Sequence, residues 1–149
     1  MKRPAAWQKR FVDQLGALTE ETGLPPSTMR VFAWLLVCQP EDQTVEELRA
    51  ASGSSAGAIS AATTTLVTMG LVERATRAGD RRHYYRLRPG GGQRLLRQRL
   101  DTVARVRATA DEALAAAPSR QPRIEEMRDF YAWFADTMAG RLADHDPRA

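Results

Sequence analysis

A short segment in the middle of the chain carries the signals of two helices joined by a tight turn. Thr44 and Glu47 form the pattern of a capping box, in which each side chain binds a free amide at the start of a helix. Ser52-Gly53 then supplies a turn, and apolar residues such as Ile59 and Leu66 recur along one side of the helix that follows. Two short helices joined through a glycine turn predict a helix-turn-helix motif.

A pair of short strands is predicted directly after this motif. Gly70 ends the second helix, and residues 71–75 and 83–87 have the composition of short strands. The loop between them, residues 76–82, is polar and contains a glycine. The segment therefore predicts a β-hairpin. Together with the two helices it predicts a winged helix-turn-helix, a mainly α fold with a small β-hairpin wing.

Two helical patterns precede the motif. Apolar residues recur at helical spacing from Trp7 to Leu18, and Pro25 follows the end of that pattern. Residues 29–37 are apolar nearly all round, which predicts a helix at the buried centre of a domain.

Two more helical patterns follow the hairpin. A long one carries an apolar seam from Leu96 to Ala117, interrupted by Arg107, and a final one follows Pro122. We predict one folding unit over residues 1–149, because a chain of 149 residues leaves little room for a second core. Within it we expect a winged helix-turn-helix lobe over residues 24–90 and dimerisation helices over residues 1–23 and 91–149.

The positive charge of the chain is concentrated in one region. The formal net charge is +4, which permits a polyanionic partner without demanding one. Between residues 73 and 107, arginines greatly outnumber the three acidic residues. Residues 31–48 hold the opposite balance, with several carboxylates and no Lys or Arg. The positive charge is therefore local to the stretch between residues 73 and 107.

The second helix of the motif has an outer face without charged side chains. Opposite the apolar stripe, helical geometry exposes small residues, namely Ala56, Gly57, Ser60, Ala61 and Thr64. Ordinary surface helices usually carry charged residues there, so this face favours close approach to a major groove of DNA. Ser54 and Ser55 would meet phosphates at the start of the helix. The face offers no Arg, Asn or Gln, so sequence preference would come from thymine methyl groups and groove shape.

The loop of the hairpin adds arginines that would reach a minor groove and its phosphates, with Asp80 orienting a neighbouring arginine. A solvated run of charges is the simpler interpretation of the loop alone, and its position beside a helix-turn-helix favours DNA. The predicted DNA-binding residues are Ser54, Ser55, Ala56, Gly57, Ser60, Thr63, Thr64, Arg77, Asp80, Arg81 and Arg82. The alternative is a winged-helix module for protein–protein assembly, in which the arginines would contact an acidic partner.

Catalysis and metal binding find little support in the chain. Residues 53–57 match the pattern G-x-S-x-G of serine hydrolases, yet a helix precedes the serine and only His83 and His145 are available as bases. We therefore predict no enzymatic activity, no metal site and no cofactor. The single cysteine, Cys38, lies in an apolar run and is interpreted as a buried thiol. The chain has no apolar run that could span a bilayer, and we expect a cytoplasmic protein.

Aromatic and methionine residues are frequent in the first and last helices. They are most simply core residues, and in a symmetric dimer they would also leave a cavity beneath the lobe. We expect this cavity to bind a hydrophobic or amphiphilic effector. Its predicted lining consists of Trp7, Phe11, Phe130, Tyr131 and Phe134.

Several runs of the sequence resemble the MarR family of winged helix-turn-helix repressors. These runs include RVFAWLLVC at residues 30–38, SSAGAIS at 54–60, GLVER at 70–74 and AGDRRHYYRLRP at 78–89. Within the family they are most similar to the GbsR-like actinobacterial branch, which includes repressors of MmpL-type lipid and drug exporters. The resemblance covers residues 24–90 closely and the flanking helices only in pattern.

The resemblance implies a homodimeric transcriptional repressor that is released from duplex DNA by a small molecule and controls an exporter. It places the dimer interface in the terminal helices, the recognition helix at about Ser54 to Met69, and the tip of the wing at Asp80, Arg81 and Arg82. One departure is Ala56, where many relatives have a basic residue. The DNA sequence that the protein binds cannot be transferred from those relatives.

Overall fold

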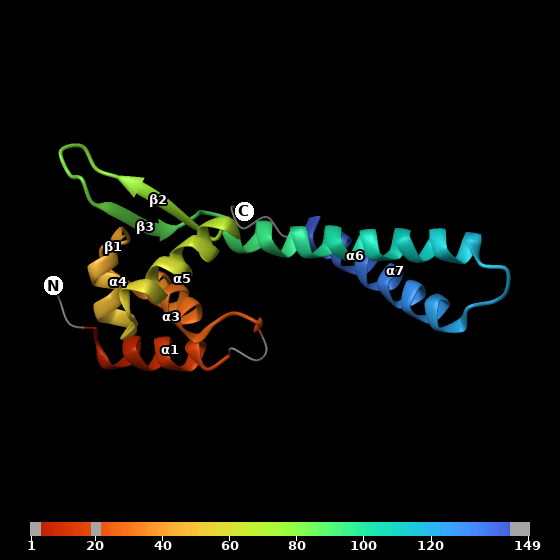
Figure 1. The fold of residues 1–149 in the computed structure, drawn as a ribbon, viewed down its shortest axis with the longest axis horizontal. Helices are drawn as coiled ribbons and strands as arrows, with labels where there is room; N and C mark the ends of the chain where they lie inside the picture. Colours follow the sequence, from red (N-terminus) through yellow and green to blue (C-terminus); the bar gives the residue numbers. More distant parts are fainter. Residues whose placement is uncertain (1–3, 19–21, 144–149) are drawn as a thin grey trace. The chain divides into compact units, whose positions relative to one another are not determined.

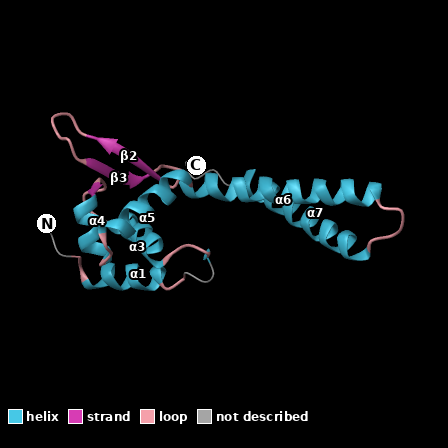
Figure 2. Cartoon of the chain, viewed as in Figure 1, coloured by secondary structure: helices cyan, strands magenta, loops and turns pink. Residues whose placement is uncertain are grey.

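The computed structural model describes residues 4–18 and 22–143, and it is mainly helical with one small sheet (Figures 1 and 2). The chain divides into two compact units, residues 1–92 and residues 93–149. The mainly α fold with a β-hairpin wing is as predicted. The elements are α1 (Ala6–Gly16), α3 (Pro26–Val37), β1 (Gln43–Thr44), α4 (Val45–Ser52), α5 (Ala56–Thr68), β2 (Val72–Thr76), β3 (His83–Leu87), α6 (Gly91–Ala116) and α7 (Pro122–Ala143).

Helix α3 lies at the centre of the first unit. Val31 and Ala33 of this helix are completely buried. The neighbouring elements contribute equally buried side chains, among them Leu48 from α4, Leu66 from α5 and Val72 from β2. Burying one such aliphatic side chain stabilises a fold by about 1.5–3 kcal/mol. The prediction that residues 29–37 form the buried centre is confirmed, except that Leu36 is 47% exposed.

Helix α1 packs on α3 within the first unit. Val12 is buried, and the side chain of Gln8 donates a hydrogen bond to the carbonyl oxygen of Val37 at 2.7 Å. At Gly16 a Cβ atom would lie only 2.6 Å from Cγ of Arg30, so a larger residue there would displace the arginine. The sequence placed residues 1–23 among the dimerisation helices, and that role stays a prediction.

The helix-turn-helix forms through the expected local interactions. The hydroxyl of Thr44 accepts the N–H of Glu47 at 3.3 Å, and the Glu47 carboxylate accepts the N–H of Thr44 at 2.7 Å. This is the predicted capping box. Gly53 ends α4 with a φ of 67°, a left-handed conformation that strains any residue with a Cβ. Helix α5 then begins after Ser55.

The sheet has three antiparallel strands in the order β1-β3-β2. Strands β2 and β3 form the predicted hairpin, with Thr76 paired with His83 next to the loop. The sequence did not reveal β1, whose two residues pair with Tyr84 and Tyr85 of β3. This short strand holds the loop that precedes the helix-turn-helix against the wing.

The second unit consists of most of α6 and all of α7. Arg107 pairs with Asp136 at 3.6 Å, and Arg128 pairs with Asp111 at 3.1 Å, so ion pairs join the two helices. Arg107, the residue that interrupts the apolar seam of α6, makes one of these two contacts with α7. Several large apolar side chains stay exposed, including Leu96 at 57%, Phe130 at 58% and Trp133 at 60%.

Candidate DNA interface

The exposed face of α5 has the composition that the sequence indicated. Ala56, Gly57, Ser60, Ala61 and Thr64 are exposed, whereas Ile59 and Leu66 on the opposite side are completely buried. The helix contains no charged residue. Its outer face is therefore flat and uncharged, and no long side chain separates the backbone from an approaching partner.

Thr63 does not belong to this face. Its side chain is only 2% exposed, and its hydroxyl donates a hydrogen bond to the carbonyl oxygen of Ile59 at 2.9 Å. Thr63 lies one helical turn after Ile59 and therefore points to the same buried side. The prediction that Thr63 contacts DNA is wrong, and the exposed threonine of this turn is Thr64.

Ser54 and Ser55 lie at the start of α5. Ser55 is the N-cap, and its hydroxyl oxygen accepts the N–H of Ala58 at 3.2 Å. The first amides of a helix have no partner within the helix and attract anions. Ser55 of the G-x-S-x-G segment is thus the N-cap of α5. The element before this segment is helix α4, whereas serine hydrolases have a strand at that place. His83 is exposed on β3, and His145 lies outside the described residues.

At the tip of the wing, Asp80 holds Arg82. The Nε and Nη2 atoms of Arg82 donate to the Asp80 carboxylate at 3.0 and 2.7 Å, and the Arg82 N–H donates at 2.9 Å. The hydroxyl of Tyr84 donates to the same carboxylate at 2.6 Å. The hydrogen bonds from Arg82 and then from Tyr84 lower the pKa of Asp80 well below its usual range. The predicted orientation of an arginine by Asp80 is confirmed.

A second acidic residue neutralises part of the wing. Nη2 of Arg77 donates to Asp42 at 3.0 Å, and the Arg77 guanidinium lies 4.2 Å from the centre of the Tyr84 ring. Arg86 lies 3.8 Å from the same Asp42 carboxylate. Asp42 directly precedes β1, and the pairing of β1 with β3 brings it to the wing. Sequence reasoning missed this contact because the residues are far apart in the chain.

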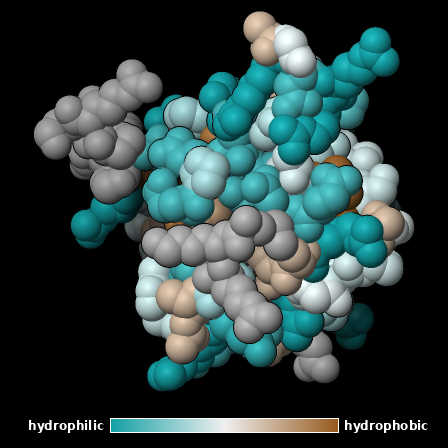
Figure 3. Space-filling view, turned by 90° about the vertical axis from the view of Figure 1, so that its left-hand side faces the viewer, coloured by the Kyte–Doolittle hydropathy of each residue, from teal (hydrophilic) through white to brown (hydrophobic). Residues whose placement is uncertain are grey.

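The remaining arginine of the loop, Arg81, has no hydrogen bond or ion pair with any residue that the structure describes. Its guanidinium is exposed at the tip of the hairpin. On strand β3 the next cation, Arg86, donates to Glu73 at 2.6 Å. Within residues 77–82, Arg81 is therefore the cation whose charge no described carboxylate offsets. In Figure 3, most of the coloured surface on the face turned toward the viewer is hydrophilic.

The predicted effector residues are divided between the two units. Trp7 is 60% exposed on α1, and Phe11 lies on the same helix. Phe130, Tyr131 and Phe134 lie on α7, where the ring centres of Phe130 and Phe134 are 6.4 Å apart. Within the second unit a cavity of about 470 Å³ is lined instead by residues such as Val106, Ala110 and Met127. The common cavity stays a prediction.

Cys38 is buried, and its burial raises the pKa of the thiol to about 11. The interpretation of Cys38 as a buried thiol is confirmed. Among the helices that the structure describes, none is both long enough and apolar enough to cross a membrane.

Comparison with known proteins assigns the chain to a family. Residues 22–83 match the model of the MarR family, and residues 90–145 match the model of MmpR5-like MarR family transcriptional regulators. The protein belongs to the MarR family and is a DNA-binding transcriptional regulator with a winged helix-turn-helix. This is a class of regulators and not a class of enzymes.

Two relatives are similar over nearly their whole length. The chain is 38% identical over 142 residues to the HTH-type transcriptional regulator MmpR5 of Mycobacterium tuberculosis, covering 93% of this chain and 86% of the relative. It is also 38% identical to a transcriptional regulator of known crystal structure. That likeness has a TM-score of 0.74 and covers 92% of this chain and 96% of the other. The assignment to the GbsR-like branch stays a prediction.

Proposed function

We propose that the protein is a homodimeric repressor that lays the exposed face of α5 in the major groove of its operator. The observation that carries this proposal is the uncharged face of small residues on α5, next to a wing whose tip presents Arg81 without a partner among the described residues. The residues proposed to contact DNA are Ser54, Ser55, Ala56, Gly57, Ser60, Thr64, Arg77, Asp80, Arg81 and Arg82.

In this proposal the protein recognises the sequence of its operator mainly through the shape of the DNA rather than through hydrogen bonds to bases. Bidentate contacts to a base, each worth about 1–3 kcal/mol, need Arg, Lys, Asn or Gln, and the α5 face has none of these. The methyl group of Thr64 and the Cβ atoms of Ala56 and Ala61 fit thymine methyl groups. The guanidinium of Arg81 contacts phosphates or enters a narrow minor groove. Because the width of the minor groove depends on the DNA sequence, groove shape supplies the remaining preference for one sequence over another.

The dimer and its effector are part of the same proposal. Apolar side chains such as Leu96, Phe130 and Trp133 are more than half exposed in the described chain, and a second copy would cover them. An amphiphilic effector bound near these helices would favour a form of the dimer in which the distance between the two α5 helices does not match successive major grooves of DNA. The dimer would then release the DNA. The resemblance to repressors of MmpL-type exporters suggests an exporter gene as the target.

A pair of identical substitutions tests the DNA-binding face. Ser60→Glu places a negative charge at the centre of the exposed α5 face, and Ser119→Glu places the same charge in the exposed loop between α6 and α7. Like charges brought together at an interface cost several kcal/mol. We expect Ser60→Glu to weaken operator binding by more than about tenfold, since 1.4 kcal/mol corresponds to a factor of ten.

Fluorescence anisotropy with a duplex selected from the genome of the source organism measures this loss, and thermal unfolding verifies that both variants fold. Ser119→Glu should bind DNA as the parent does. Equal binding by the two variants would remove α5 from the interface. A fatty acid added below its micelle concentration should lower operator affinity, and a response restricted to polar metabolites would contradict the effector proposal.

A further inference from the structure

One carboxylate from outside the wing lies against the arginines of the wing. Asp42 directly precedes β1, and the pairing of Gln43 with Tyr85 brings it beside β3. Its Oδ2 atom accepts a hydrogen bond from Nη2 of Arg77 at 3.0 Å, and its Oδ1 atom lies 3.8 Å from Nη1 of Arg86. Asp42 therefore places a negative charge beside the cations that are expected to meet DNA.

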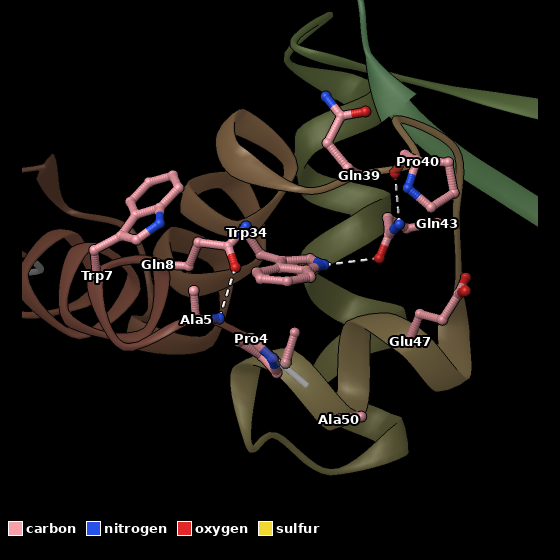
Figure 4. A pocket seen from close by; sticks show the side chains of 11 residues that line it. Pro4, Ala5, Trp7, Gln8, Trp34, Gln39, Pro40, Gln43, Glu47 and Ala50 are labelled. Carbon is pink, nitrogen blue, oxygen red and sulfur yellow. Dashed lines mark hydrogen bonds between the residues drawn. The ribbon is translucent and has the colours of Figure 1, made fainter. Parts of the chain in front are cut away.

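The backbone that carries Asp42 is held in place by its neighbour. Gln43 is buried, and its side chain forms hydrogen bonds at both ends (Figure 4). The indole N–H of Trp34 donates to its oxygen at 2.8 Å, and its nitrogen donates to the carbonyl oxygen of Pro40 at 2.7 Å. The side chain of Asp42 is itself only 22% exposed. The carboxylate thus belongs to a fixed part of the first unit and stays beside the wing when another anion approaches.

Arg77 is the cation that depends most on Asp42. Among the described residues, Asp42 is the only carboxylate that forms an ion pair with Arg77, whereas Arg86 also donates to Glu73 at 2.6 Å. The guanidinium of Arg77 lies 4.2 Å from the centre of the Tyr84 ring, and its side chain is 49% exposed. Cations are attracted to the faces of aromatic rings. Without the charge of Asp42, Arg77 would therefore keep its place over this ring, open to an anion from solvent.

The ion pair decides what Arg77 contributes to DNA binding. Exposed ion pairs are weak, so a phosphate can take the place of Asp42 at the guanidinium. Asp42 is then left without this partner close to the negatively charged DNA. Whether Arg77 stays with Asp42 or turns to a phosphate, the two residues together bring no net charge to the complex. The pair should consequently add almost nothing to the release of counterions from the DNA.

We propose that Asp42 limits the electrostatic affinity of the wing for DNA by competing with phosphates for Arg77. This inference rests on the proposed function, in which the wing contacts DNA. It assigns a role in the strength of binding to a residue outside both the wing and the recognition helix α5. Because the ion pair is independent of the DNA sequence, the effect extends to DNA of unrelated sequence.

Binding to a duplex of unrelated sequence tests the proposal, since such binding is almost entirely electrostatic. Fluorescence anisotropy between 50 and 200 mM salt gives the slope of log K against log salt concentration for the parent and for Asp42→Asn. Asparagine keeps the shape of the side chain, and thermal unfolding verifies the fold. With two copies of Arg77 released in the dimer, we expect the slope of Asp42→Asn to be steeper by about 1.8. Its affinity at 50 mM salt should rise by more than about tenfold.

Glu41→Gln is the matched control for Asp42→Asn. It removes the neighbouring carboxylate, which is exposed and whose side chain forms no hydrogen bond or ion pair with a residue that the structure describes. Both substitutions change the net charge by the same amount, so a general effect of charge would steepen both slopes equally. We expect the slope of Glu41→Gln to stay close to that of the parent.

A double variant shows which cation supplies the gain. Asp42→Asn/Arg77→Gln has the net charge of the parent and no cation at this position. We expect its slope and its affinity to return to those of the parent. A gain that came from the introduced asparagine, or from Arg86, would remain in the double variant.

Three results would overturn the proposal: a slope of Asp42→Asn that equals the slope of the parent, an equal steepening in Glu41→Gln, and a double variant that keeps the steeper slope. Arg81→Ala distinguishes these results from a failure of the proposed function. If the wing does not contact DNA, Arg81→Ala keeps the slope of the parent. If the wing contacts DNA without control by Asp42, Arg81→Ala flattens the slope while Asp42→Asn leaves it unchanged.

Discussion

Replacing Arg81 by Ala separates the free cation of the wing from the paired ones. Arg82 is held by Asp80 through Nε and Nη2, and Arg77 donates to Asp42 at 3.0 Å. Arg81 has no such partner among the described residues, so its charge is available to a DNA phosphate without breaking an existing ion pair. We expect Arg81→Ala to remove one phosphate contact from each copy of the chain.

The size of the effect follows from counterion release. Each neutralised phosphate contributes about 0.9 to the slope of log K against log salt concentration, so two copies of Arg81 contribute about 1.8. Between 50 and 200 mM salt, the parent should therefore lose about twelvefold more affinity than Arg81→Ala. Fluorescence anisotropy with the operator duplex over this range of salt measures both slopes.

The matched control is the double variant Asp80→Asn/Arg82→Gln, which removes an ion pair without changing the net charge. The introduced asparagine still has a side-chain oxygen that can accept the hydroxyl of Tyr84, which donates to Asp80 at 2.6 Å in the parent. Asp80 and Arg82 are proposed to meet DNA as an ion pair without net charge, so the salt slope of the double variant should stay close to that of the parent even where its affinity falls. If Arg81→Ala keeps the parent slope while the double variant loses about 1.8, the paired arginine is the anchor and the reasoning fails.

Three further predictions concern the helix-turn-helix and the cysteine. Gly57→Ala adds a Cβ that meets nothing within 4 Å, so it should stabilise α5 by about 0.5–1 kcal/mol. The added methyl group should nevertheless weaken operator binding. Unchanged binding would show that α5 does not approach DNA closely. Gly53→Ala should have the opposite effect on stability, because the φ angle at this position is 67°. Denaturant titrations should show a free energy of unfolding lower by about 1 kcal/mol. An unchanged free energy of unfolding would contradict the left-handed turn at Gly53. Cys38, with its pKa raised to about 11, should react with iodoacetamide at pH 8 far more slowly than free cysteine, and rapid alkylation of the native protein would contradict its burial.

Local signals in the sequence predicted the elements that depend on neighbouring residues. The capping box of Thr44 and Glu47, the turn at Gly53 and the hairpin after Gly70 all follow from short-range patterns, and the structure has each of them. The exposed face of α5 followed from helical geometry in the same way. Thr63 was included among the DNA-binding residues although its spacing from Ile59 places it on the buried side.

Contacts between distant residues could not be read from such patterns. Strand β1 has only two residues, too few for an alternating pattern, and it exists because β3 offers an edge. Asp42 consequently reaches Arg77, 35 residues away in the chain, and changes which arginine of the wing is free. The hydrogen bond from Trp34 to Gln43 likewise depends on how α3 and β1 pack, which no local pattern encodes.

The most direct test of the account is the composition and footprint of the complex with DNA. Fragments of the source genome that bind the purified protein are selected, and sedimentation of one complex gives the number of chains per duplex. We predict two chains on a two-fold symmetric site, with half-sites whose centres lie about 10 base pairs or a multiple of this apart. One chain on an asymmetric site, or no selected fragment at all, would contradict the proposal that two α5 helices and two wings read the operator together.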